Sequence, residues 1–250
     1  MLKPIAIALS ISGISALLPL SAHALDLKSA VNVETLKTAI TQGSSSSKDL
    51  DQNTLVNGLK ESLAVGAQRA IETVSQSGGY LNDSKIHIPI PGDLQKLADV
   101  MNQVSLGSKV RKFEKSMNTA AEVAAPKAAT ILTEAITSMT FADAKAIYSG
   151  GEHAATDYLK KVSESKIKDA FTPAIDDALV QVDATKHYKV FASEASSIPL
   201  VRGNVDLDLT NYVTQKAVDG LFVKLAEQEA AIRQNPVAQT TELLQTLWGK

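Results

Sequence analysis

Residues 51–79 read DQNTLVNGLKESLAVGAQRAIETVSQSGG, and their pattern is the main indication of the fold class. Its apolar side chains recur at steps of three and four residues, which places them on one side of an α-helix. The repeated positions are Leu55, Leu59, Leu63, Ala67, Ala70, Ile71 and Val74. Asp51 or Asn53 suits the start of such a helix as a cap, and Gly78-Gly79 suits its end because glycine adopts the left-handed conformation readily. The stretch therefore predicts a long amphipathic helix.

Helical spacing continues along most of the remaining chain. Further helices are expected at about residues 93–104, 108–125, 127–138, 140–150, 152–162, 165–182, 184–195 and 208–234. Thr140-Phe141-Ala142-Asp143 suits the start of the 140–150 helix as a capping arrangement, and Asn235-Pro236 suits the start of a last helix that ends near Trp248. No run of alternating β-branched residues is long enough to build a sheet. The prediction is an all-α, irregular multi-helix bundle, folded as a single domain over residues 51–250.

Tyr80–Gly92 is a clearly non-helical stretch within this region. Ile86-His87-Ile88-Pro89-Ile90-Pro91 alternates as an extended strand does, but two prolines in three residues exclude it from the interior of a sheet. We therefore expect one extended, Pro-containing loop that lies across the helices and that the fixed φ angles of its prolines keep rigid. The favoured role is a strap over the core, and the alternative is the wall of an apolar groove.

The composition bounds the class of protein. The chain has 250 residues, of which 44% are hydrophobic and 21% charged, as in an ordinary globular protein with a sizeable core. The absence of cysteine excludes disulfides, thiolate metal sites, a cysteine nucleophile and a lipidated N-terminal cysteine. A formal net charge of −2 argues against nucleic acid as a partner. Aromatic residues, at 4%, are too few to favour stacking platforms for bases or sugars.

Residues 1–24 have the pattern of a cleaved signal peptide. Lys3 supplies a positive start, an apolar run follows, and Ala22-His23-Ala24 is the small-x-small pattern that signal peptidase recognises. The run is slightly short for a membrane-spanning helix and contains Pro19, so an uncleaved anchor is the less favoured alternative. Residues 25–50 contain a Gly-Ser tract and are expected to form a flexible N-terminal segment. The sequence thus predicts a periplasmic protein with no transmembrane segment in its mature chain.

A set of short strings occurs in a specific order along the chain. They are GLKESL at 58–63, IPIPG at 88–92, FE at 113–114 with SMN at 116–118, AAE at 120–122, GG at 150–151 with AAT at 154–156, and YVT at 212–214 with DGLF at 219–222. In this order they resemble a bacterial envelope family known as domain of unknown function 4197. The resemblance covers most of the chain from about residue 55 and implies an all-helical exported protein. It supplies no activity, ligand or catalytic residue.

Three polar residues form a row on the helix expected at 108–125. Glu114, Asn118 and Glu122 are spaced at four-residue steps, which stacks their side chains beside the apolar face of the helix. The two carboxylates lie about 12 Å apart, too far for direct acid–base pairing. Each has possible partners on another helix, such as Arg69 or Lys60. The favoured hypothesis is a buried hydrogen-bond network; a solvated edge and a ligand-orienting site are the alternatives.

Other chemistry is weakly supported. His153 and Asp157 lie one helical turn apart and would present two metal ligands, but a site needs a third, and Glu152 points elsewhere. Nothing in the spacing of His87 or His187 recruits either of them. No Gly-x-Ser-x-Gly elbow and no glycine-rich phosphate loop occurs in the sequence. We therefore predict no metal site, no cofactor and no catalytic residue.

Two further segments carry weaker signals. The charges of the 208–234 helix are expected to form a solvated face, and they are Lys216, Asp219, Lys224, Glu227, Glu229 and Arg233. The final segment places Leu243, Leu244, Leu247 and Trp248 on one apolar stripe. This stripe either docks on the body of the protein, which is favoured, or provides a partner surface.

The leading functional hypothesis is a non-enzymatic binding or scaffolding role in the bacterial envelope. Its partner would be an unidentified envelope protein or an apolar small molecule. The ligand-binding residues would then be Tyr80, Ile88, Phe113, Glu114, Met117 and Asn118. The alternative is a hydrolase-like enzyme in which Glu114 or Glu122 is the general base and Asn118 orients the substrate.

Overall fold

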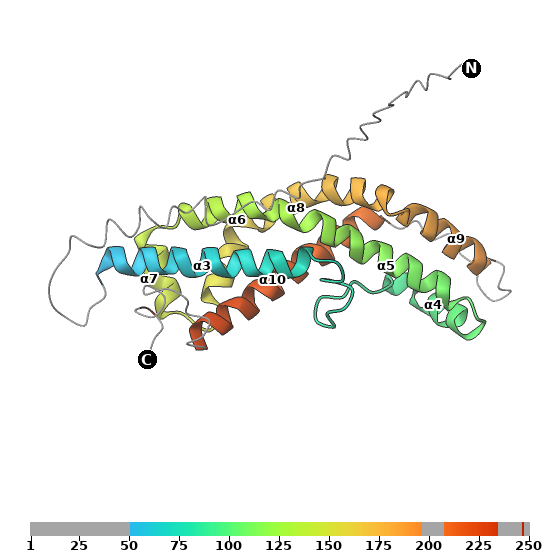
Figure 1. Cartoon of the computed structure of the whole chain (residues 1–250), viewed down its shortest axis with the longest axis horizontal. Helices are drawn as coiled ribbons and strands as arrows, with labels where there is room; N and C mark the ends of the chain where they lie inside the picture. Colours follow the sequence, from blue (N-terminus) through green and yellow to red (C-terminus); the bar gives the residue numbers. More distant parts are fainter. Residues whose placement is uncertain (1–50, 197–207, 235–246, 248–250) are drawn as a thin grey trace, which may run out of the picture.

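The computed structural model describes residues 51–196, 208–234 and 247 (Figure 1). It contains α3 (Gln52–Ser75), α4 (Gly92–Gln103), α5 (Gly107–Ala124), α6 (Ala128–Thr137), α7 (Phe141–Ser149), α8 (Ala154–Gln181), α9 (Ala184–Ser196) and α10 (Leu209–Gln234), with a 3-10 turn at Ala125–Lys127. No strand occurs in these ranges, so the predicted all-α multi-helix bundle is confirmed. The expected signal peptide, the segment 25–50 and most of the last helix lie outside the described residues.

The helices form an elongated body (Figure 1). One end carries α7 and the start of α3, whereas α4 and α9 lie at the other end. Helix α10 packs on α3, α5 and α8, and α5 packs on α8 and α9. Among the helices so described, none is both long and apolar enough to cross a membrane.

Helix α3 buries the apolar stripe that its sequence predicts. All seven stripe residues are buried, including Leu59, Ala67 and Val74. The helix ends at Ser75, before the expected glycine pair, and Gly78 then takes the positive φ of +82° that reverses the chain. Periodicity thus identified the buried face correctly, and the glycine marks the reversal that follows the helix.

Helix α7 begins with the capping box expected from its sequence. The Thr140 hydroxyl accepts a hydrogen bond from the Asp143 amide at 3.2 Å, and the Asp143 carboxylate accepts one from the Thr140 amide at 2.9 Å. Hydrogen bonds from Thr140 lower the pKa of the Asp143 carboxyl. The two partners are three residues apart, so the local sequence suffices to specify this start.

The separate helices expected at 152–162 and 165–182 are wrong, because α8 is continuous from Ala154 to Gln181. Ser163 lies at the expected break, but its hydroxyl donates to the Leu159 carbonyl at 2.6 Å within the same helix. The serine hydroxyl therefore has its hydrogen-bond partner within the helix, and the helix continues past it. Pro173 also lies inside α8, which continues for two further turns beyond it.

Leu247 is the described residue of the C-terminal segment. It is buried and belongs to the same apolar core as α3, α5, α8 and α10. This agrees with the expected docking of the segment on the body. The other residues of its apolar stripe lie outside the described residues.

Candidate functional site

The loop between α3 and α4, residues 76–91, crosses the core as a strap held between α5 and α10. Its apolar side chains Tyr80, Ile86, Ile88 and Ile90 are buried. The Tyr80 hydroxyl donates to the Ala217 carbonyl of α10 at 2.7 Å. Burial raises the pKa of this phenol above its ordinary value, and the charge of Glu122 adds to the effect. Tyr80 is therefore a neutral anchor of the strap.

Asn118 fixes the middle of the strap to α5. Its side-chain carbonyl accepts from the Ile88 amide at 2.9 Å, and its amide group donates to the Ile88 carbonyl at 2.8 Å. It also donates to the Glu114 carbonyl at 2.9 Å within α5. Asn118 is completely buried, so both peptide groups of Ile88 depend on it in place of water.

The two glutamates of the same row also bind the strap. One carboxylate oxygen of Glu122 accepts from the Tyr80 and Leu81 amides at 3.3 and 3.4 Å. Glu114 lies 3.0 Å from Nε2 of His87, whose Nδ1 lies 2.9 Å from the Leu81 carbonyl. The row therefore forms a network with the loop.

The partners suggested from sequence for this row, Lys60 and Arg69, do not join it. Lys60 donates instead to the Thr137 carbonyl at the end of α6, at 2.7 Å. Arg69 lies beside a shallow hollow with Glu72 and Gln228. The row faces a loop, and helix periodicity does not predict where a loop lies.

The six residues expected to bind a ligand all lie at or beside this strap. Five are completely buried, namely Tyr80, Ile88, Phe113, Met117 and Asn118, and the Glu114 side chain is 25% exposed. The Phe113 ring packs at 5.5 Å from Tyr188 and 5.6 Å from Phe191, joining α5 to α9. The structure brings the six together around packed contacts, and ligand binding by them stays a prediction.

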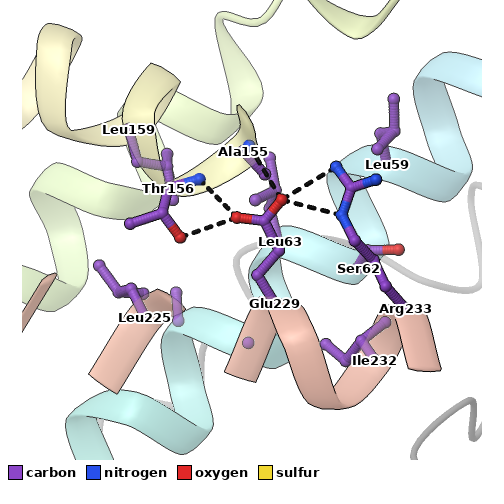
Figure 2. Close-up of a pocket in the computed structure, with 12 residues that line it drawn as sticks. Leu59, Ser62, Leu63, Ala155, Thr156, Leu159, Leu225, Glu229, Ile232 and Arg233 are labelled. Atoms are coloured by element: carbon purple, nitrogen blue, oxygen red, sulfur yellow. Dashed lines mark hydrogen bonds and ion pairs between the residues drawn. The ribbon is translucent and has the colours of Figure 1, made fainter. Parts of the chain in front are cut away.

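A hollow of about 30 Å³ lies elsewhere, between α3, α8 and α10 (Figure 2). We call it the α3–α8–α10 pocket. Its lining is mostly aliphatic and consists of Leu59, Ser62, Leu63, Gly66 and Ala67 of α3, Ala155, Thr156 and Leu159 of α8, and Leu225, Glu229, Ile232 and Arg233 of α10. A charged pair in a mostly apolar lining distinguishes this pocket from the packed strap.

Glu229 of α10 caps the first turn of α8. One carboxylate oxygen accepts from the Thr156 amide and hydroxyl, both at 2.8 Å, and the other accepts from the Ala155 amide at 3.0 Å. His153 at the N-cap position of α8 makes no side-chain cap of its own. A buried carboxylate from a distant helix thus satisfies the orphan amides and opposes the helix dipole.

Arg233 connects the same carboxylate to the end of α7. Its Nε donates to Glu229 at 2.9 Å, and its Nη2 donates to the Ile147 carbonyl at 3.1 Å. Figure 2 shows both side chains of the pair reaching from α10 toward the start of α8. The pair therefore joins the end of one helix and the start of the next to a third helix.

A second charged cluster joins the strap to α10. Lys224 bonds both Asp83 and Glu227, and Lys85 pairs with Glu227 at 2.7 Å. The hydrogen bond from Lys224 lowers the pKa of the Asp83 carboxyl. Burial alone would lower the pKa of Lys224, but its bonds to Asp83 and Glu227 outweigh burial and raise it.

The solvated face expected for α10 is wrong at three positions. Lys224 and Glu229 are buried, and the Arg233 side chain is only 13% exposed. The sequence of residues 217–233 does indicate this burial, because apolar residues occur there on all sides of the helix. A helix of that kind lies in the centre of a protein, so charges on it require partners.

The possible metal ligands named from the sequence do not lie together in the described part of the chain. Glu152, His153 and Asp157 are all exposed, and His87 and His187 lie in different elements. Within residues 51–196 and 208–234, no three histidine or acidic side chains come close enough to hold a metal ion.

Comparisons with known proteins place the chain in a family without giving it an activity. No curated protein and no solved structure matches it. A model of a protein family described as a protein of unknown function, DUF4197, matches residues 49–249. This match covers every described helix and includes the strap, the polar row of α5 and the charged pair of α10. The resemblance read from the ordered strings is confirmed: the chain belongs to the DUF4197 family.

Proposed function

We propose that this protein is a non-enzymatic binding protein of the bacterial envelope and that the α3–α8–α10 pocket receives the apolar end of a small ligand. The main support for this proposal is that the Glu229 carboxylate is fully occupied by hydrogen bonds within the protein. Both of its oxygens already accept hydrogen bonds from α8 or Arg233. A general base needs a lone pair directed at its substrate, whereas this carboxylate holds helices together.

The remaining polar groups of the pocket are engaged in the same way. Ser62 donates to the Gly58 carbonyl at 2.8 Å, and Thr156 donates to Glu229. The surface left for a ligand is therefore the aliphatic part of the lining, such as Leu63, Leu159 and Leu225. Such a surface favours an alkyl or similarly apolar group.

The size of the pocket limits what enters it. A hollow of about 30 Å³ has room for about two water molecules, since each needs roughly 10–15 Å³ on this measure. A chain end of about two carbon atoms would fill it, and the rest of the ligand would lie outside.

The envelope assignment is supported by residues 1–24 and by no part of the bundle itself. A positive start, an apolar run and the Ala22-His23-Ala24 pattern are typical of a signal peptide. Export before folding would place the bundle in the periplasm, where a protein without cysteine folds unaided by disulfides.

Native mass spectrometry of the protein, taken gently from the envelope of its own host, tests the proposal. We expect a reproducible extra mass that is lost on denaturation and a mature chain that lacks residues 1–24. Gly66→Ala should reduce the occupancy, because the added methyl lies at the pocket wall and meets Gln228 and Ile232 at an ordinary 3.6 Å. Gly92→Ala is the matched control, since a methyl there meets nothing within 4 Å.

Two results would contradict the proposal: a bare protein in every preparation, or an extra mass that both glycine variants retain equally. The hydrolase-like alternative gives a different pattern. Glu114 pairs with His87 at 3.0 Å and is partly exposed, so Glu114→Gln should abolish turnover if the protein is an enzyme. The same variant should leave ligand mass unchanged if the protein is a carrier.

A further inference from the structure

A second hollow lies between α5 and α9, on helices that do not line the α3–α8–α10 pocket. Its volume is about 250 Å³, and Lys109, Lys112, Lys186, His187 and Val190 line it. We call it the basic cleft. The helix segments that carry its lining, the start of α5 and α9, lie toward the end of the body that also carries α4 (Figure 1). Nothing in the proposed apolar binding uses these residues.

Aromatic packing fixes the two walls of the basic cleft. Phe113, which follows Lys112 directly, contacts the rings of Tyr188 and Phe191 at 5.5 and 5.6 Å. Val190 of the lining directly precedes Phe191. The two cleft lysines of α5 and Lys186 of α9 therefore lie on helices that an aromatic cluster holds together, and Phe113 and Phe191 of this cluster are completely buried.

The charge of the basic cleft is one-sided. Among the described residues, three lysines and a histidine line it and no carboxylate does, although the whole chain contains 25 Lys and Arg against 27 Asp and Glu. In the described part of the chain, Lys109, Lys112 and Lys186 form no ion pair, whereas Lys85 and Lys224 do. Within residues 51–193 and 208–234, positive charge at this place therefore has no paired protein counter-charge.

We propose that the basic cleft binds a phosphate group, either free or carried by a soluble compound or a lipid headgroup. Lysine ammonium groups bind phosphate oxygens through charge-assisted hydrogen bonds, and several point charges on two facing helices suit a multiply charged anion. The hollow is larger than a phosphate group needs, so it also accommodates part of a substituent. This proposal is independent of ligand binding in the α3–α8–α10 pocket.

The test compares inorganic phosphate, titrated by calorimetry, with vesicles of phosphatidylglycerol in phosphatidylcholine, measured by co-sedimentation. The variant replaces all three cleft lysines: Lys109→Gln, Lys112→Gln and Lys186→Gln. The control replaces Lys145, Lys161 and Lys166 by Gln, three exposed lysines on α7 and α8, and changes the net charge equally. Both variants should keep the thermal stability of the wild type, because all six changes are at partly or fully exposed side chains.

We expect binding to fall at least about tenfold in the cleft variant and less than about twofold in the control, since several charge-assisted contacts are lost only in the former. Binding of inorganic phosphate alone identifies a soluble source, and binding of the vesicles alone identifies a lipid headgroup. The proposal is overturned if the wild type binds neither probe. It is equally overturned if the control variant loses as much as the cleft variant, because general surface charge would then account for the binding.

Discussion

Two regions of the molecule contain similar polar contacts but differ in packing. They are the strap between α5 and α10 and the pocket between α3, α8 and α10. In both regions a buried polar side chain reaches backbone amides of a distant segment: Asn118 reaches Ile88, and Glu229 reaches the first turn of α8. Around the strap, aromatic and aliphatic groups fill the remaining space. Around the charged pair, a hollow remains.

A helical glycine in each region records this difference. A methyl at Gly220 of α10 would lie 2.7 Å from the Tyr80 ring and 3.1 Å from Ile86, so this glycine admits the strap. A methyl at Gly66 of α3 would meet Gln228 and Ile232 at 3.6 Å, which is ordinary contact. The surroundings of Gly220 at the strap are thus too tightly packed for a methyl group, whereas those of Gly66 at the pocket have room for one. The strap is therefore built for rigidity, and the pocket has room to accept a group.

The largest effect is expected from Glu229→Ala, which breaks the framework of the pocket. The change leaves the Ala155 and Thr156 amides without their acceptor and removes the Glu229–Arg233 ion pair. Removing one partner of a buried pair costs about 3–5 kcal/mol of unfolding free energy. Urea denaturation measures the loss. Glu227→Ala, at a partly exposed pair, should cost less than about 1 kcal/mol, and equal losses at the two positions would refute the role given to Glu229.

Asn118→Ala should have the next largest effect, on the strap. Both peptide groups of Ile88 lose a buried partner, and each such group costs about 1–3 kcal/mol when unsatisfied. Hydrogen exchange should also accelerate at the Ile88 amide before it does in α3. A stable variant with unchanged exchange at Ile88 would show that Asn118 does not hold the strap.

The features that the sequence predicts correctly are those set by neighbours along the chain. The seven-residue stripe of α3 and the capping box of Thr140 each depend on residues within one or two turns. The order of the polar row on α5 followed from the same periodicity. Its partners did not, since Glu122, Asn118 and Glu114 bind a loop some 27 to 42 residues away in sequence.

The charged pair of α10 was missed for the same physical reason. Glu229 and Arg233 are four residues apart, a spacing equally typical of an exposed helix face. Their partners on α7 and α8 lie more than 70 residues away, and only the packed fold brings them together. The continuity of α8 through Ser163 escaped prediction because a serine at a break and a serine bonded within a helix look alike in sequence.

Gly220→Ala tests how closely the strap packs on α10. The added methyl would overlap the Tyr80 ring, and insertion into a filled core costs about 1–3 kcal/mol. Thermal unfolding should show the loss. Tyr80→Phe does not relieve the overlap because the ring is unchanged, so the double variant should be no more stable than Gly220→Ala alone. A fully stable Gly220→Ala protein would mean that the strap is loosely packed.

Gly66→Ala, at the pocket, should raise the stability of the protein, whereas Gly220→Ala lowers it. The methyl is accommodated, and alanine favours a helix interior over glycine by about 0.5–1 kcal/mol. The midpoint of thermal unfolding should rise by about 2 °C for a protein of this size. A destabilised Gly66→Ala variant would show that the space beside α3 is already filled.

The smallest effect is expected from acid, and it acts on the edge of the strap. The hydrogen bond from Lys224 holds the pKa of Asp83 below its ordinary value of 3.8, so this carboxylate stabilises the fold at higher pH. That contribution is complete above pH 3.8 and is lost as the pH falls through the lower pKa of the folded state. Asp83→Asn should therefore be less stable than the wild type at neutral pH and equal to it at the acid end. Parallel stability curves for the two proteins across this range would mean that Asp83 and Lys224 do not tie the strap to α10. The strap would then be held by its bonds to Glu114, Asn118 and Glu122 of α5, by the Lys85–Glu227 pair and by the Tyr80 hydroxyl.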